Sequence, residues 1–141
     1  MFLGEYRHSI DYKGRLSIPK KFRGDLIGGV ITRGLDGCLF LYPKKDWETL
    51  SKKIQDLPLT KEDARSFARY IFSGAERLDF DKLGRARVPE SLRTYAKLKT
   101  EVVLVGVAIR VEVWNKDIWE KYKKRTESEG EKTAEKLTGA I

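Results

Sequence analysis

Polar and apolar positions alternate along several short stretches of the chain, as they do in β-strands that bury one face. Residues 15–18 show this alternation directly, and residues 102–113 are rich in β-branched side chains, which favour strands. A turn sequence at residues 34–37 separates two apolar runs. The pattern predicts strands over residues 6–11, 15–18, 30–32 and 39–42, and two more within 102–113 on either side of Gly106.

Three further stretches predict helices. Pro19 can open a short helix over residues 20–26, because its fixed φ suits the first turn. Apolar residues at positions 47, 50, 54 and 57 share one face of a second helix, which Pro58 ends. A third helix is predicted from an N-cap at Thr60, with an aspartate three residues on as in a capping box, to a C-cap at Gly74.

Two parts of the chain repeat one pattern. Residues 10–23 match residues 80–93 at an offset of 70, with Asp, Gly, Arg, Pro and a final Arg identical and apolar residues at the same places. The match resumes at an offset of 72, where Trp47 pairs with Trp119. Two matching blocks in the same order indicate an internal duplication.

The duplication divides the chain into four parts. The repeat units are residues 1–50 and 75–122, a helical connector covers residues 51–74, and a charged tail covers residues 123–141. Each unit alone would be marginally stable because a chain of that size buries too little surface, so we expect the units to share a core. The tail has few apolar positions, and a helix that starts near residue 121 is expected to fray into a mobile segment.

Charge narrows the class of partner. The net charge is +8, and residues 1–100 hold 21 Lys and Arg against 13 Asp and Glu, whereas residues 101–141 hold 8 of each. The surplus therefore lies with the repeated motif, and a basic domain of this kind favours a polyanion. Nucleic acid, an anionic membrane surface and a merely solvated basic face all stay open on charge alone. No apolar run approaches the roughly 20 residues of a membrane span.

The reactive side chains are few. Cys38 is the one cysteine, so no disulfide can form within the chain, and an apolar strand around it indicates a core position. His8 is the one histidine and the one imidazole base for a catalytic set. No Cys/His zinc site can be built from one of each. We predict a cytoplasmic protein that is not an enzyme and uses no metal, cofactor or small-molecule substrate.

The sharpest motif is Asp-x-x-Gly-Arg, which occurs at residues 11–15 and again at residues 81–85. Glycine permits a positive φ in a tight turn, and the aspartate carboxylate can accept hydrogen bonds from turn amides or hold an arginine. A hairpin turn fixed by an ion pair is the simpler interpretation of the Asp and Gly positions. The structural residues of the motif are Asp11, Gly14, Asp81 and Gly84.

Basic residues crowd both copies of the motif. Side chains at alternate strand positions, followed by a helical turn, can meet phosphates along one groove. A solvated charged face is the alternative. The candidate DNA-binding residues are Lys13, Arg15, Lys20, Lys21, Arg23, Arg85 and Arg87. The first copy is the more basic, so we favour it as the copy that faces DNA, with the second serving the fold or an assembly contact.

These residues resemble the MraZ family, bacterial regulators built from two SpoVT-AbrB-type units. The resemblance is carried by the Met-Phe-Leu-Gly opening at residues 1–4, the block at residues 10–19 and its repeat at residues 81–89. It covers about residues 1–122, and the doubled motif makes it specific. No motif position departs from the family pattern, and the tail carries none of its motifs.

The resemblance implies a fold and a function. The fold is mainly β with short helices, of the α+β class, in which two tandem units clasp each other as a pseudo-two-fold swapped-hairpin β-barrel within one chain. The function is sequence-specific binding of double-stranded DNA, as a ring-shaped homo-oligomer, at repeated promoter sites of the division and cell-wall gene cluster. Such binding would mostly repress the cluster, including the regulator's own gene, and would place the protein at the nucleoid.

Other functions stay open. An antitoxin-like or nonspecific architectural protein can use the same barrel, although the short charged tail offers few apolar anchors for a toxin. RNA binding would need strand aromatics such as Tyr6, Tyr12 and Tyr42 as stacking platforms, where core packing is the simpler role. An enzyme would need a site assembled between chains.

Overall fold

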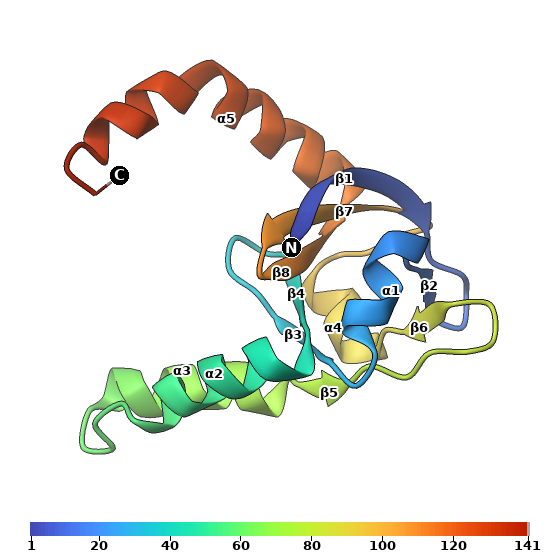
Figure 1. Cartoon of the computed structure of the whole chain (residues 1–141), viewed down its shortest axis with the longest axis horizontal. Coiled ribbons are helices and arrows are strands. Elements are labelled where there is room, and N and C mark those ends of the chain that lie inside the picture. The colour runs from blue at the N-terminus through green and yellow to red at the C-terminus, as the bar shows by residue number, and fades with distance from the viewer. Residues whose placement is uncertain (141) are drawn as a thin grey trace.

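A computed structural model describes residues 1–140, which form a six-stranded sheet, a two-stranded sheet and five helices (Figure 1). The strands are β1 (Phe2–Ser9), β2 (Arg15–Ser17), β3 (Val30–Arg33), β4 (Leu39–Tyr42), β5 (Glu76–Arg77), β6 (Arg85–Arg87), β7 (Glu101–Ala108) and β8 (Arg110–Asn115). The helices are α1 (Lys20–Leu26), α2 (Lys44–Gln55), α3 (Glu62–Ser73), α4 (Glu90–Tyr95) and α5 (Lys116–Lys136). The predicted α+β class, mainly strands with several helices, is confirmed.

Strands of the two repeat units interleave. The six-stranded sheet has the order β1-β7-β8-β4-β3-β5, so β1 of the first unit pairs with β7 of the second, and β8 of the second pairs with β4 of the first. The two-stranded sheet takes β2 from one unit and β6 from the other. The larger sheet ends at β1 and β5 and is not closed into a barrel. Isolated bridges join Ile10 to Leu16 and Phe80 to Ala86.

The main core is shared between the units. Leu16 and Ile18 of the first unit and Ala86 and Val88 of the second are buried in it, at equivalent positions of the repeat. A second cluster contains Cys38 and Trp114, and five further aromatic or aliphatic side chains of α2 and α5 pack against it. The interpretation of Cys38 and of the tryptophans as core residues is confirmed.

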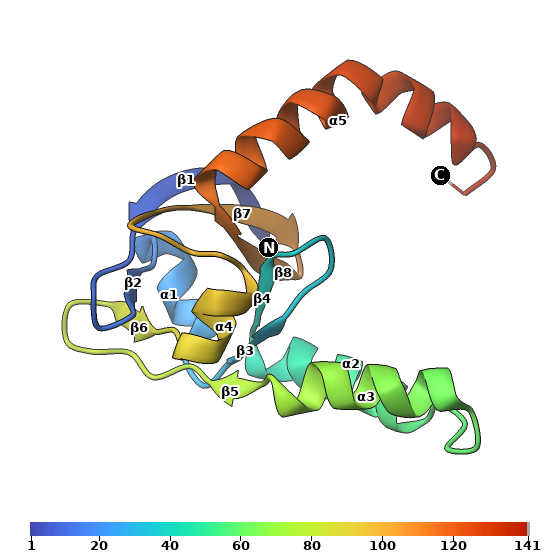
Figure 2. The same ribbon diagram turned by 180° about the vertical axis from the view of Figure 1, so that it is seen from behind.

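Helices α2 and α3 form a hairpin that projects from the body, as both views show (Figure 1, Figure 2). Its base is fixed to β3, because buried Thr32 donates a hydrogen bond from Oγ1 to the carbonyl of Ile71 at 2.7 Å. The predicted cap at Thr60 is wrong. The N-cap is Lys61, without a side-chain cap, because a turn in which the Lys61 amide donates to the Pro58 carbonyl occupies the preceding residues.

The predicted turn at Gly106 is also wrong. Strand β7 runs through this residue, and the hairpin turns at Ala108 and Ile109 instead. A Cβ atom at Gly106 would lie 2.4 Å from the backbone nitrogen of Leu3, which belongs to the neighbouring strand. Gly106 pairs with Gly4 across the two strands. The glycine therefore serves a close approach of backbones, which the alternation pattern does not reveal.

Helix α5 is longer than predicted. Its N-cap is Asn115, whose side chain accepts a hydrogen bond from the amide of Ile118 at 3.0 Å. The helix then runs to Lys136 and leaves the body as a second arm, so the predicted fraying is wrong over this span (Figure 1). Lys123 pairs with Glu5 of β1 at 3.0 Å and so ties the first turns of the arm to the sheet. Ile141, the last residue of the predicted tail, lies outside the described residues.

None of the helices in the described part of the chain combines the length and the apolar composition that a bilayer crossing requires.

Candidate nucleic-acid interface

The first Asp-x-x-Gly-Arg motif folds into a turn organised by its own carboxylate. Oδ1 of Asp11 accepts hydrogen bonds from the amides of Lys13 at 3.0 Å and Arg15 at 2.9 Å. Oδ2 accepts from Nε of Arg15 at 2.7 Å. Gly14 has a φ of 82°, in the left-handed region that glycine adopts without strain. One aspartate thus fixes both the turn and the direction of the arginine.

The second motif has the same geometry. Asp81 accepts from the amides of Leu83 at 2.9 Å and Arg85 at 3.0 Å, and from Nε of Arg85 at 2.8 Å. Gly84 has a φ of 76°. In both turns the pKa of the aspartate lies below its ordinary value, chiefly because the arginine amide donates to the carboxylate and further because the arginine side chain does. Both carboxylates are therefore ionised at neutral pH.

Strands β2 and β6 leave these turns as a two-stranded antiparallel ribbon. Arg15 lies opposite Arg87, and Arg85 lies opposite Ser17. The central pair, Leu16 and Ala86, is buried in the core. Since successive side chains of a strand point to opposite faces, the flanking residues lie on the outer face. The fold thereby gathers three arginines from two distant parts of the chain on one exposed surface.

The outer face of the ribbon is positively charged despite the two carboxylates. Arg15 and Arg85 are each held by one aspartate through Nε, and Nη1 of Arg85 also lies 3.8 Å from Asp11 of the other turn. Arg87 is exposed and makes no ion pair with residues 1–140. With Lys13 and Lys82 in the turns, five cationic side chains stand against two anionic ones. The ribbon therefore attracts anions.

Arg23 and Arg93 lock the two turns together. Arg23 donates from Nε to the carbonyl of Ile18 at 2.8 Å, and a Cβ atom at Gly84 would lie 2.4 Å from its guanidinium carbon. Arg93 occupies the same place in the second unit: it donates to the carbonyl of Val88 at 3.1 Å and lies against Gly14. Each arginine thus packs on the turn glycine of the other unit.

This packing changes the roles expected of two basic residues. Arg23 is one of the candidate DNA-binding residues, yet its guanidinium is engaged within the fold and positions the second turn. Arg93 is one of the basic residues of the second motif but is not among the candidate DNA-binding residues. Its signal was present, because Arg93 is the repeat equivalent of Arg23 at the offset of 70.

The remaining candidates are lysines beside the ribbon. Lys13 lies at the tip of the first turn, and Lys20 and Lys21 open α1, which lies next to β2 in both views (Figure 1, Figure 2). All three are exposed. Nζ of Lys21 lies 4.5 Å from the centre of the Tyr6 ring, so this lysine is partly held by a cation–π contact. Lys20 has no such contact with residues 1–140.

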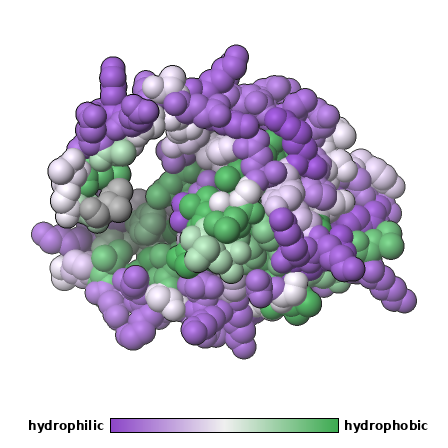
Figure 3. Space-filling view, turned by 45° about the horizontal axis from the view of Figure 1, so that its top comes forward, coloured by the Kyte–Doolittle hydropathy of each residue, from purple (hydrophilic) through white to green (hydrophobic). Residues whose placement is uncertain are grey.

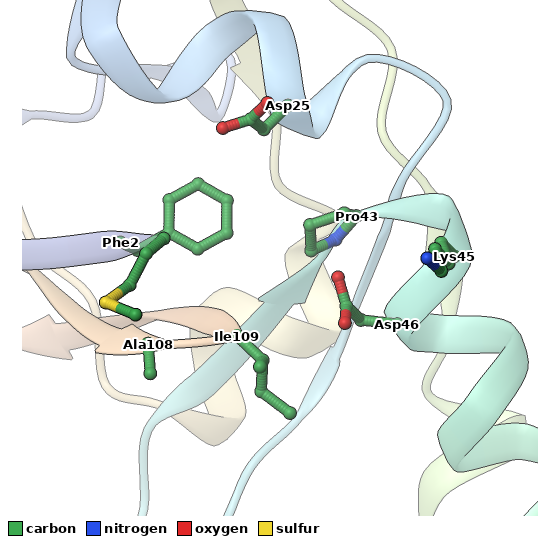
Figure 4. Close-up of a pocket in the computed structure, with 8 residues that line it drawn as sticks. Phe2, Asp25, Pro43, Lys45, Asp46, Ala108 and Ile109 are labelled. Atoms are coloured by element: carbon green, nitrogen blue, oxygen red, sulfur yellow. The ribbon is translucent and has the colours of Figure 1, made fainter.

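A pocket of about 450 Å³ lies elsewhere on the molecule, where β1, the end of α1 and the start of α2 meet (Figure 4). It is lined by Met1, Phe2, Asp25, Pro43, Lys45, Asp46, Ala108 and Ile109. Its lining contains no serine, cysteine or histidine. Among residues 1–140 no group of three or more His, Cys, Asp and Glu side chains is placed to hold a metal ion. Figure 3 shows apolar residues gathered near the middle of one face and hydrophilic residues around them.

Comparison with known proteins agrees with the repeat. The family described as "MraZ protein, putative antitoxin-like" matches the chain twice, over residues 1–70 and residues 71–139. A protein of Pelotomaculum thermopropionicum named "Transcriptional regulator MraZ" is 53% identical over 138 residues, which cover 97% of this chain and 95% of that protein. Proteins of the same name from Natranaerobius thermophilus and Moorella thermoacetica are 49% and 50% identical, over 97% of this chain and 96% of theirs.

Proposed function

The chain belongs to the MraZ family, and from this premise we propose that it is a transcriptional regulator that binds double-stranded DNA sequence-specifically through the outer face of the β2–β6 ribbon. The observation that carries the proposal is the gathering of Arg15, Arg85 and Arg87 on that face. The major groove of B-DNA, about 12 Å wide, admits a two-stranded ribbon. Arginine is the residue that most often reads guanine there, through two acceptors on the base edge.

The turn geometry favours base readout by Arg15. Asp11 holds Nε of Arg15 and leaves the two terminal nitrogens of the guanidinium for a ligand. A guanidinium held in one orientation loses less conformational entropy when it grips a base edge than a free side chain does. Asp81 holds Nε of Arg85 in the same way, and Nη1 of Arg85 also lies 3.8 Å from Asp11 of the other turn, which leaves Nη2 the more available nitrogen. We assign Arg15, Arg85 and Arg87 to the groove, and the first motif, with its more basic surroundings, to the principal contact.

The lysines supply a second, less specific contribution. Lys13, Lys20 and Lys21 are exposed and are assigned to phosphates, which position a protein on the duplex without reading its sequence. Their share of the affinity falls steeply as salt rises, because each neutralised phosphate releases counterions. Arg23 contributes mainly by holding the second turn.

The fold and assembly form part of the proposal. The interleaving of strands from both units and the bridges of Ile10 to Leu16 and of Phe80 to Ala86 support a pseudo-two-fold swapped-hairpin arrangement of the units. Residues 51–74 act as the connector between units 1–50 and 75–122, and residues 123–141 form the tail. A ring-shaped homo-oligomer would present many ribbons, and engaging repeated promoter sites together can raise avidity by roughly 10²–10⁴. We infer repression of the division and cell-wall gene cluster, including its own gene, by a cytoplasmic, nucleoid-associated protein.

A binding titration tests the proposal. Purified protein is titrated against the DNA upstream of its own gene and against a scrambled duplex, at two salt concentrations. A preference for the upstream DNA that survives the higher salt is expected. Arg15→Ala should reduce that preference, whereas Lys20→Ala should weaken binding to both duplexes alike.

The second candidate is a nonspecific architectural or antitoxin-like protein, and the family's description as antitoxin-like favours the latter. It predicts equal binding to both duplexes that collapses at the higher salt. Equal losses on both duplexes for Arg15→Ala and Lys20→Ala would exclude base reading by Arg15.

A further inference from the structure

The tips of the two motif turns each expose one large apolar side chain. Tyr12 is 84% exposed and Leu83 is 69% exposed. Single apolar residues on a surface are common and need no explanation. Here, however, both lie inside the Asp-x-x-Gly-Arg motifs. Tyr12 stands two residues before the motif glycine and Leu83 stands one residue before it, and a ribbon strand begins at the residue after each glycine.

The two tips have the same composition in opposite order. Tyr12 is followed by Lys13 in the first turn, and Lys82 is followed by Leu83 in the second. Each tip therefore carries one cation and one apolar group, but the repeat equivalent of Leu83 is Lys13 and that of Tyr12 is Lys82. Both tips therefore combine a lysine with a large apolar side chain, although the two residues occupy exchanged positions of the repeat.

The turns fix the backbone that carries these side chains. The amide of Leu83 donates to Asp81 and the amide of Lys13 donates to Asp11, so each tip is fixed by the carboxylate that also fixes the ribbon arginine. An apolar side chain on a fixed backbone beside arginines suits a ligand that is anionic overall and has apolar groups at defined positions. DNA is such a ligand, because the C5 methyl group of thymine projects into the major groove.

We propose that Tyr12 and Leu83 are specificity-determining residues that contact thymine methyl groups on either side of the bases read by the ribbon arginines. The inference rests on the proposed function, since it requires the ribbon to lie in the major groove. It also gives the protein a means to distinguish DNA from RNA, because the uracil of RNA lacks this methyl group. The inverted order of the two tips makes the two ends of the ribbon chemically different, so one docking direction is preferred on a given site.

The test replaces thymine by uracil throughout the upstream DNA, by synthesising the duplex with deoxyuridine triphosphate. This removes the methyl groups and keeps the base pairing. The full-length protein, the double variant Tyr12→Ala/Leu83→Ala and the control Leu59→Ala are titrated with both duplexes. Leu59 is a matched control because it is 79% exposed and lies in the connection between α2 and α3, in the projecting hairpin.

Wild type and Leu59→Ala are expected to bind the thymine duplex more tightly than the uracil duplex, by about fourfold for each methyl group contacted. The double variant is expected to lose this methyl-dependent part of the preference for the thymine duplex. Changes of DNA shape caused by uracil affect all three proteins alike, so the difference between variant and wild type isolates the methyl contact.

Two outcomes overturn the inference while the proposed function stands. In the first, wild type prefers its upstream DNA over scrambled DNA but binds the thymine and uracil duplexes with equal affinity. In the second, the double variant keeps the full preference of wild type for the thymine duplex. A wild type that binds upstream and scrambled thymine duplexes equally overturns the proposed function itself, and the inference with it. A scrambled thymine duplex, titrated alongside the other two, distinguishes these cases.

Discussion

Replacing Gly84 by alanine tests the crossed packing of each turn on an arginine of the other unit. The new methyl group would lie 2.4 Å from Nε and Cζ of Arg23, at a residue with a φ of 76°. Gly28→Ala is the matched control, because Gly28 has a φ of 78° and no atom lies within 4 Å of its Cβ position. The two substitutions therefore share the backbone strain and differ in the contact with Arg23.

The expected difference follows from one hydrogen bond. A left-handed φ costs alanine about 1–2 kcal/mol in both variants, and the smaller entropy of the unfolded chain offsets about 0.4–1 kcal/mol of this in both. At Gly84 the guanidinium of Arg23 must also move away, which breaks its 2.8 Å hydrogen bond to the carbonyl of Ile18. A hydrogen bond from a charged group contributes about 1.5–3 kcal/mol. Gly84→Ala should therefore destabilise the fold by about that much more than Gly28→Ala.

Urea denaturation followed by circular dichroism, at one fixed protein concentration, measures the difference, since any self-association would otherwise shift the midpoint. Gly14→Ala should lose at least as much as Gly84→Ala, because its methyl group would lie 2.7 Å from the backbone oxygen of Val88, which cannot rotate away. Unfolding free energies of Gly84→Ala and Gly28→Ala that agree within about 0.5 kcal/mol, the spread of ordinary surface substitutions, would refute the reasoning.

Three further predictions concern the framework of the site. Thr32→Val removes the hydrogen bond to the Ile71 carbonyl and should cost about 1–3 kcal/mol, with faster amide exchange in α3 than in wild type. The lowered pKa of Asp11 and Asp81 implies a contribution to folding stability that is present above their unfolded pKa near 3.9 and is lost as the pH falls through the folded values. When both residues are replaced by Asn, the unfolding free energy should fall less steeply with acid than in wild type. Equal pH dependences of the unfolding free energy in the two proteins would contradict this. Burial raises the pKa of the Cys38 thiol, so a thiol reagent at pH 8 should label it only after denaturant is added, and labelling of the native protein would count against a buried site.

Local features of the fold were predictable because their causes are local. The turn at each motif depends on an aspartate, a glycine and an arginine within five residues, and these interactions recur in any chain that carries the motif. Helix α1 likewise begins at the residue after Pro19, as expected. The repeat itself was visible in the sequence because both units need the same residues to form the same turns.

The features that sequence reasoning missed depend on contacts between distant segments. Gly106 looked like a turn residue, but its role is set by Leu3, more than one hundred positions earlier. Arg23 looked like a free cation until the fold placed it on Gly84. The outer face of the ribbon could not be deduced either, because alternation assigns Arg15 and Arg87 to exposed positions without showing that they lie opposite each other.

The interleaving of strands has a consequence for biosynthesis. Strand β1 is the first to be translated, yet its partner β7 begins at Glu101, so the strand edge stays unpaired while the ribosome adds about 100 residues over roughly 5–20 s. Nascent chains with open edges and non-local pairings fold slowly and aggregate easily. A product that stops before β6 has neither a shared core nor a ribbon. Premature termination between the units therefore leaves no fragment that can form even a weakened ribbon.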